Sequence, residues 1–114
     1  MKAFLLSLLV LGSISAQAKL TVFGSKQALQ VVANDEATIA KVLTKSNTDT
    51  LKAISVESIE TNVFEVKVTS TKLDSSCETE VFLKSKPEVV VLPSGAKIAT
   101  NKLVVSKIGS VDCR

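Results

Sequence analysis

The chain has 114 residues, with 14 basic and 11 acidic side chains and no histidine, tryptophan or tyrosine. Without histidine it lacks the most common general acid–base residue, a principal zinc ligand and most catalytic triads. Its lysines are scattered among acids, with no interleaved aromatic residues, so the footprint of a nucleic-acid-binding protein is missing. These absences favour a protein that is not an enzyme, uses no cofactor and binds no nucleic acid.

Residues 1–18, MKAFLLSLLVLGSISAQA, have the three parts of a secretory signal peptide. Lys2 is followed by an apolar run, and Ala16 and Ala18 occupy the −3 and −1 positions of a cut after Ala18. A membrane anchor needs ~20 consecutive apolar residues, and this run is about half as long. The sequence predicts a cleaved leader, a single small α+β domain at 19–114 with no membrane span, and export to the periplasm or the extracellular space.

The stretch after the leader, KLTVFG at 19–24, is rich in residues that favour strands, so it predicts a first short strand. Ser25 follows as the expected N-cap of a helix. From 26 to 46 the apolar residues form two groups with i, i+3, i+4 spacing, and the phase changes between them at Asn34 and Asp35. The pattern predicts one broken helix or two helices, the second capped by one of these two residues.

Residues 51–71 carry the pattern of a β-hairpin. In its second arm Phe64, Val66 and Val68 alternate with polar residues, which is the period of a half-buried strand. A three-residue loop at 60–62 keeps the apolar residues of both arms on one face, whereas a two-residue loop does not. It also places Asn62 where such loops need a left-handed backbone. The pairs set opposite each other are then Ile54–Val68, Val56–Val66 and Ser58–Phe64.

Further strands are expected at 77–84, with Val81 and Leu83 directed inward, and near 88–92 and 102–108. The stretch Val89 to Leu92 is four consecutive apolar residues. Such a run favours a buried core strand over a strand that faces a partner. Pro87 and Pro93 stand at its ends, where proline removes no internal bond of the ladder.

The two cysteines, Cys77 and Cys113, are expected to form a disulfide, because an even number in an exported chain implies pairing. On the chain-entropy view this bridge contributes roughly 4 kcal/mol. Taken together, the elements predict an α+β fold with one disulfide. An N-terminal helix or helix pair packs on one face of a four- or five-stranded antiparallel sheet.

The candidate partner-binding loop is the turn that follows the apolar stretch. Proline, serine and glycine are turn formers, and a lysine follows them. The loop residues are Pro93, Ser94, Gly95 and Lys97. Glu78 and Glu80 share one face of a strand, as the paired carboxylates of a glycosidase share a cleft, but alternating charge on a strand is typical of a solvated face. We therefore expect no catalytic, cofactor-binding or metal-binding residues.

Two partial resemblances concern the layout and the loop. The predicted order of a strand, a helix and four strands, with a disulfide in the C-terminal half, resembles cystatins. Where cystatins carry Gln-x-Val-x-Gly, this chain reads IETNV at 59–63, so the inhibitory function does not carry over. The sequence SGAK at 94–97 is similar to the Ser-Gly loop of small periplasmic lysozyme inhibitors. Their motif continues into a tyrosine, which this chain lacks, and neither resemblance assigns a family.

Export, a small fold closed by a disulfide and the lack of recognisable catalytic residues favour a small exported binding or inhibitory protein without enzymatic activity. The sequence does not name its partner, and a protein is the partner considered first. The alternative is a structural or assembly component of the cell envelope that associates through a sheet edge.

Overall fold

The computed structural model describes residues 20–114, which fall into two compact units. The larger unit comprises Val22–Ser85 and Leu103–Arg114. The smaller unit, as far as it is described, comprises residues 20 and 21 and Lys86–Lys102. The predicted leader and Lys19 lie outside the described residues. Among residues 20–114, no helix is long and apolar enough to cross a membrane.

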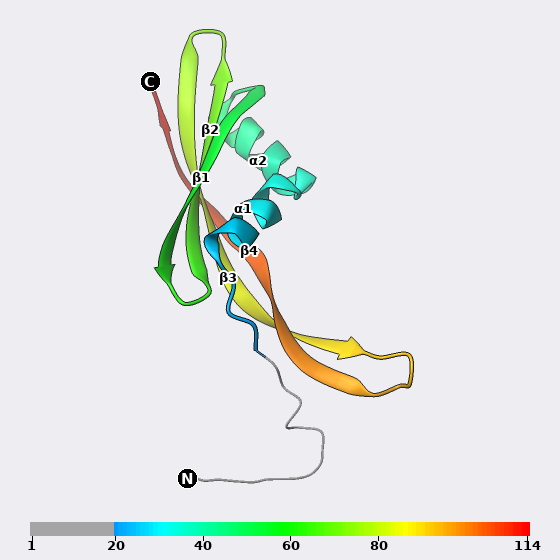
Figure 1. The fold of residues 1–114 in the computed structure, drawn as a ribbon. Helices are drawn as coiled ribbons and strands as arrows, with labels where there is room; N and C mark the ends of the chain where they lie inside the picture. The colour runs from blue at the N-terminus through cyan, green and yellow to red at the C-terminus, as the bar shows by residue number, and fades with distance from the viewer. Residues whose placement is uncertain (1–19) are drawn as a thin grey trace. The chain divides into compact units, whose positions relative to one another are not determined.

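Two helices are followed by four strands (Figure 1). The helices are α1 (Ser25–Ala33) and α2 (Glu36–Ser46), and the strands are β1 (Thr50–Glu60), β2 (Val63–Lys72), β3 (Ser75–Val91) and β4 (Lys97–Cys113). The strands form one antiparallel sheet in the order β1-β2-β3-β4. The predicted α+β fold with a helix pair and one disulfide is therefore confirmed.

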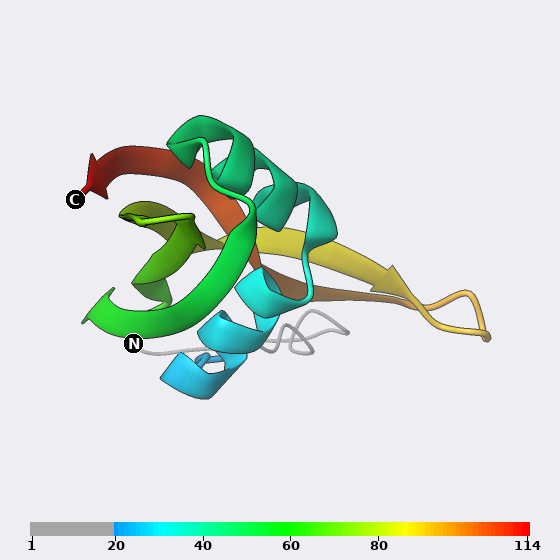
Figure 2. The same ribbon diagram turned by 90° about the horizontal axis from the view of Figure 1, so that it is seen from above.

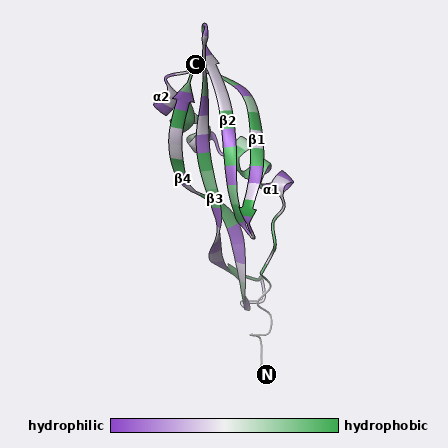
Figure 3. Ribbon diagram, turned by 90° about the vertical axis from the view of Figure 1, so that its left-hand side faces the viewer, coloured by the Kyte–Doolittle hydropathy of each residue, from purple (hydrophilic) through white to green (hydrophobic). Residues whose placement is uncertain are grey.

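In the larger unit the two helices cover one face of the curved sheet (Figure 2). Apolar and polar residues alternate along the strands, as the colours of Figure 3 show, so one face of the sheet is apolar and packs beneath the helices. The buried core comprises Ala28, Val32, Val42, Phe64, Val66, Val68, Val81, Leu83 and Leu103. The inward positions predicted for Val81 and Leu83 are confirmed.

The two helices are separate because each has its own cap. Gly24, not Ser25, is the N-cap of α1, and its N–H donates to the Gln27 side chain at 2.6 Å. Asp35 caps α2, and its carboxylate accepts hydrogen bonds from the Thr38 N–H at 3.2 Å and the Thr38 hydroxyl at 2.9 Å. The cap predicted at Ser25 is wrong by one residue, and of the two alternatives for 26–46 the helix pair is correct.

The first strand predicted at 19–24 is not formed by residues 20–24, which have no regular structure. Asparagine side chains hold this stretch in place of a strand partner. In the larger unit the Phe23 N–H donates to the Asn62 side chain at 2.7 Å. In the smaller unit the Asn101 amide accepts from the Thr21 N–H at 2.7 Å and donates to the Thr21 carbonyl at 3.0 Å.

The β1–β2 hairpin has the predicted register, with Ile54, Val56 and Ser58 opposite Val68, Val66 and Phe64. The route to that register differs from the prediction. The turn is the two-residue Thr61–Asn62, and a shift in the pairing at Ile59 supplies the extra residue. Asn62 has the expected left-handed backbone, with φ of 59°.

The strands predicted separately at 77–84 and 88–92 are one continuous strand, β3, which runs through Pro87. An extended backbone suits the fixed φ of proline, and a strand can include proline where its missing N–H faces no ladder partner.

The core position predicted for Val89 to Leu92 is wrong. Val89 and Val91 are 62% and 61% exposed, and Val90 and Leu92 are 40% and 37% exposed. They belong to a two-stranded segment of the smaller unit. Pairing satisfies the backbone there, but among the described residues no layer covers the side chains.

Candidate functional site

The β3–β4 turn is a self-contained loop at Pro93, Ser94 and Gly95. The carbonyl of Leu92 accepts from the Gly95 N–H, and the N–H of Leu92 donates to the Ala96 carbonyl, both at 2.8 Å. Gly95 has φ of 91°, the left-handed backbone that the third residue of such a loop requires. Hydrogen bonds within the turn therefore define its conformation.

All four residues of the predicted loop are exposed, and they lie together. Pro93, Ser94 and Gly95 form the turn, and Lys97 is the first residue of β4. Their role in binding stays a prediction. The sequence did not indicate that the valines beside them are also exposed, because a run of four apolar residues is the usual signature of a covered strand.

The exposed apolar residues of this hairpin occupy both of its faces. Successive side chains of a strand point in opposite directions, so Val89 and Val91 lie on one face and Val90 on the other. Val89 and Val91 are more than half exposed, and Val90 is 40% exposed. Either face of the ribbon can thus contact an apolar surface.

Positive charge accompanies this apolar segment. Residues 86–102 contain Lys86, Lys97 and Lys102 and a single acid, Glu88, which gives a net charge of +2. Lys102 and Glu88 form an ion pair at 3.5 Å. The excess charge therefore resides on Lys86 and Lys97, both of which are exposed.

The two carboxylates singled out by sequence, Glu78 and Glu80, lie in different surroundings. Glu80 accepts a hydrogen bond from the Ser110 hydroxyl at 2.8 Å. Glu78 lines a shallow hollow of about 190 Å³ together with Asp112 and Arg114. The two side chains therefore make different contacts.

The carboxylate that interacts with Glu80 is Glu65. Desolvation and a hydrogen bond to Glu80 raise the pKa of Glu65, whereas hydrogen bonds from Ser110 and then Glu65 lower the pKa of Glu80. The pairing places Glu80 opposite Lys67 and Glu65 opposite Phe82, so the two acids are diagonal neighbours on β2 and β3. Knowledge of the β2–β3 register would have been needed to find this pair. Among residues 20–114, no cluster of three acidic or cysteine side chains could hold a metal ion.

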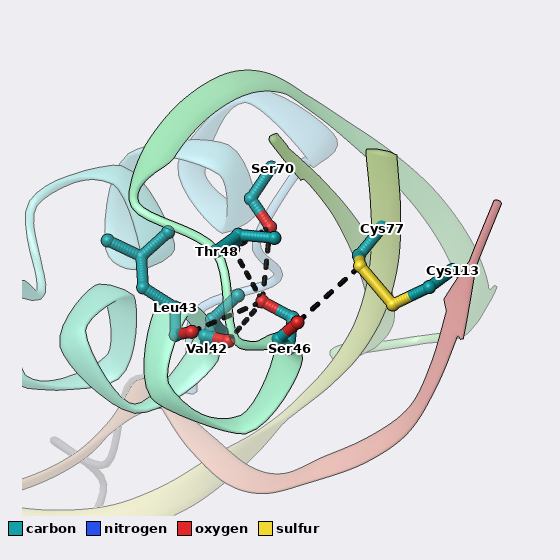
Figure 4. The surroundings of a disulfide bond; sticks show 7 residues. All are labelled: Val42, Leu43, Ser46, Thr48, Ser70, Cys77 and Cys113. Carbon is teal, nitrogen blue, oxygen red and sulfur yellow. Dashed lines mark hydrogen bonds between the residues drawn. A yellow bond between two sulfur atoms is a disulfide. The ribbon is translucent and has the colours of Figure 1, made fainter. Parts of the chain in front are cut away.

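The disulfide joins Cys77 and Cys113, as predicted (Figure 4). Ser76 and Arg114 exchange both backbone hydrogen bonds, at 3.2 and 2.8 Å, so the adjacent cysteines face each other directly across β3 and β4. Cys77 is buried and its sulfur lies 3.5 Å from the Ser46 carbonyl oxygen. The bonded sulfur carries no proton, so this is a packing contact. The disulfide therefore has a structural role.

A hollow of about 410 Å³ lies beside α2 and is lined mainly by carbon atoms of Ala40, Lys41, Thr44, Lys45 and Ile108. Lys45 closes one side of it, because its ammonium donates to the carbonyl of Gly109 at 2.7 Å. The described residues that line the hollow include no acid, and their exposed atoms are mainly apolar, so the hollow suits apolar contact.

No family model matches the chain, and no curated protein or solved structure is significantly similar to it.

Proposed function

We propose that the chain is a small exported binding or inhibitory protein without enzymatic activity, and that its binding element is the hairpin at 86–102. The observation that carries the proposal is the exposure of Val89 to Leu92 in a ribbon whose turn is fixed by its own hydrogen bonds. Contiguous exposed apolar side chains mark interaction surfaces, because removing them from water lowers the free energy.

The alternative function, an envelope component that associates through a sheet edge, is disfavoured by the outer strands of the sheet. The pairing of β1 shifts at Lys52 and again at Ile59. On β4 the Lys45 ammonium lies 2.7 Å from the Gly109 carbonyl oxygen and 3.5 Å from that of Ile108. Bulges and lysines at an edge discourage the addition of another strand.

The chemistry of the hairpin defines a complementary partner. An apolar surface would cover the valines, and negative charge beside it would balance Lys86 and Lys97. Export of the protein, with a mature chain that begins at Lys19, is part of the proposal. The intact mass of the protein recovered from its host tests that part, and a species that retains residues 1–18 would reject it.

Site-specific photo-crosslinking in the native host tests the binding role. A photoreactive residue at position 91 should form an adduct with a partner, whereas the same residue at position 59 should not. Ile59 is the matched control, because it is also an exposed aliphatic residue on a strand, at 52% exposure. Adducts at both positions, or at neither, would contradict the proposal, and an adduct between two copies of the chain would support the assembly alternative.

A further inference from the structure

The hairpin exposes apolar residues on both of its faces. Val89 and Val91 are exposed on one face of the ribbon, and Val90 is exposed on the other. A groove or flat surface on another protein would cover one face and leave the second in water. An apolar environment that surrounds the tip would cover both faces of the ribbon.

Hydrogen bonds within the turn pair part of its backbone. Outside water, an unpaired backbone group is strongly unfavourable. The N–H and carbonyl of Leu92 and the N–H of Gly95 are all bonded within the turn. The Ala96 N–H lies 3.4 Å from the Ser94 hydroxyl. Part of the backbone at the tip therefore already has a partner within the turn.

The lysines of the hairpin suit an anionic surface. Each lysine close to an anionic bilayer strengthens binding by about fivefold. Lys86 and Lys97 flank the apolar segment on the two strands, and Glu88 is paired with Lys102. Apolar residues beside an excess of lysine are the composition of interfacial membrane anchors.

Two other classes of occupant fit the same residues less well. A second copy of the chain is disfavoured because Pro87 and Pro93 bracket the valines, and prolines and charges beside an apolar strand limit self-association. A protein interface is disfavoured by composition. Such interfaces are enriched in aromatic residues and arginine and depleted in lysine, and valine is rare among their energetic hot spots.

We propose that the hairpin binds an anionic lipid bilayer, with Val89 to Leu92 inserted at the interface and the ammonium groups of Lys86 and Lys97 reaching the headgroups. This inference rests on the proposed binding role of the hairpin.

Co-sedimentation with lipid vesicles tests the inference. The purified protein, with the N-terminus that it carries in its host, is mixed with vesicles of phosphatidylcholine alone or with phosphatidylglycerol. Binding is expected only to the phosphatidylglycerol vesicles and should weaken as salt is raised, because salt screens the attraction between charges. Every variant shares the same N-terminus, so differences between variants report the hairpin.

Matched substitutions assign the binding to residues. The double variant Val89→Thr and Val91→Thr keeps the branched shape and should weaken partitioning by about tenfold or more. Lys97→Gln should weaken it by about fivefold, the factor that one lysine contributes. The controls Ile59→Thr and Lys52→Gln change exposed residues of the same kinds on β1 and should bind as the unchanged protein does. Circular dichroism establishes that each variant is folded.

The outcomes separate the lipid inference from the binding role. Absence of binding to phosphatidylglycerol vesicles, equal binding to both vesicle types, or equal loss in the β1 controls would overturn the lipid inference. A protein adduct at position 91 in the crosslinking experiment would then keep the binding role and replace lipid by protein. If no adduct forms, both proposals fail.

Discussion

Phe82 occupies the face of the sheet opposite the helices, and Gly109 makes room for its ring. A Cβ atom at Gly109 would lie 2.7 Å from Cε2 of Phe82 and 3.1 Å from a carboxylate oxygen of Glu80. The Lys107 ammonium lies 5.0 Å from the ring centroid, within the range of a cation–π contact. The absence of a side chain at Gly109, on the next strand, thus leaves space for the aromatic ring of Phe82 among charged residues.

Gly109→Ala should lower the free energy of unfolding by about 1–3 kcal/mol, because the ring must leave its place. Denaturant unfolding measures the change. In a Phe82→Ala background the same substitution should cost much less, since the main clash has gone. An equal cost in both backgrounds would show that the ring is not the cause.

The Asp35 cap gives α2 a dependence on pH. Hydrogen bonds from the backbone and side chain of Thr38 lower the pKa of Asp35 below its ordinary value of 3.8. A lowered folded-state pKa contributes stability above the unfolded-state pKa, and that contribution disappears as the pH falls through the folded-state value.

Asp35→Ala should therefore reduce the free energy of unfolding by about 1 kcal/mol at neutral pH, as the loss of a cap typically does. The difference between the two proteins should narrow as the pH is lowered through the pKa of Asp35. Denaturant titrations at a series of pH values check this, and a difference that stays constant with pH would contradict the role of the ionised carboxylate.

At the scale of elements, hydroxyl groups join the end of α2 to β2. Ser46, Thr48 and Ser70 are buried and bonded to one another at 2.6 to 3.2 Å (Figure 4). The Ser46 hydroxyl also lies 2.8 Å from the Val42 carbonyl oxygen. Nearby on β3, the Thr79 hydroxyl is buried and has no hydrogen-bond partner within residues 20–114.

These contacts predict opposite effects for two substitutions that each remove a hydroxyl. Ser70→Ala should destabilise the protein by about 1–2 kcal/mol, because Thr48 loses its acceptor. Thr79→Val keeps the shape and removes the unpartnered hydroxyl, so it should leave stability unchanged or raise it by about 1 kcal/mol. Denaturant midpoints compare the two variants. Destabilisation by Thr79→Val comparable to that of Ser70→Ala would contradict this account.

The disulfide fastens the start of β3 to the end of β4 and closes a loop with a sequence separation of 36 residues. Cys113→Ser should lower the free energy of unfolding by about 2–4 kcal/mol. Thiol titration of the unfolded protein from its host should find no reactive thiol, and two reactive thiols would contradict the bridge. Ser110→Ala, on the same strand, serves as the control for a substitution that leaves the bridge intact.

Many of the helices and strands could be predicted from sequence, because the spacing of their apolar residues is regular. The alternation from Phe64 to Val68 identified the buried face of β2, and the phase change near Asp35 marked the boundary between the helices. The prediction of a strand at 19–24 was wrong because the hydrogen bonds of this segment come from the side chains of Asn62 and Asn101. Both asparagines are distant from it in sequence. Such long-range polar contacts leave no periodicity in the segment that they hold.

At the scale of the whole molecule, the candidate site could be predicted only in part. The turn at Pro93 to Gly95 followed from local chemistry, and its exposure is observed. The environment of Val89 to Leu92 could not be predicted, because an apolar run has the same sequence whether a helix, a partner or nothing covers it. That ambiguity concerns the same residues on which the binding proposal depends.

The central claim is that the valines of the hairpin serve binding and not the stability of the fold. The denaturation midpoint of Val91→Asp, compared with that of Val66→Asp, tests it most directly. Val66 is fully buried, so an unpaired carboxylate there should cost several kcal/mol and unfold the protein. Val91 is 61% exposed, so the same change there should cost less than about 1 kcal/mol. A midpoint for Val91→Asp as low as that of Val66→Asp would place the valine in the core and contradict the account.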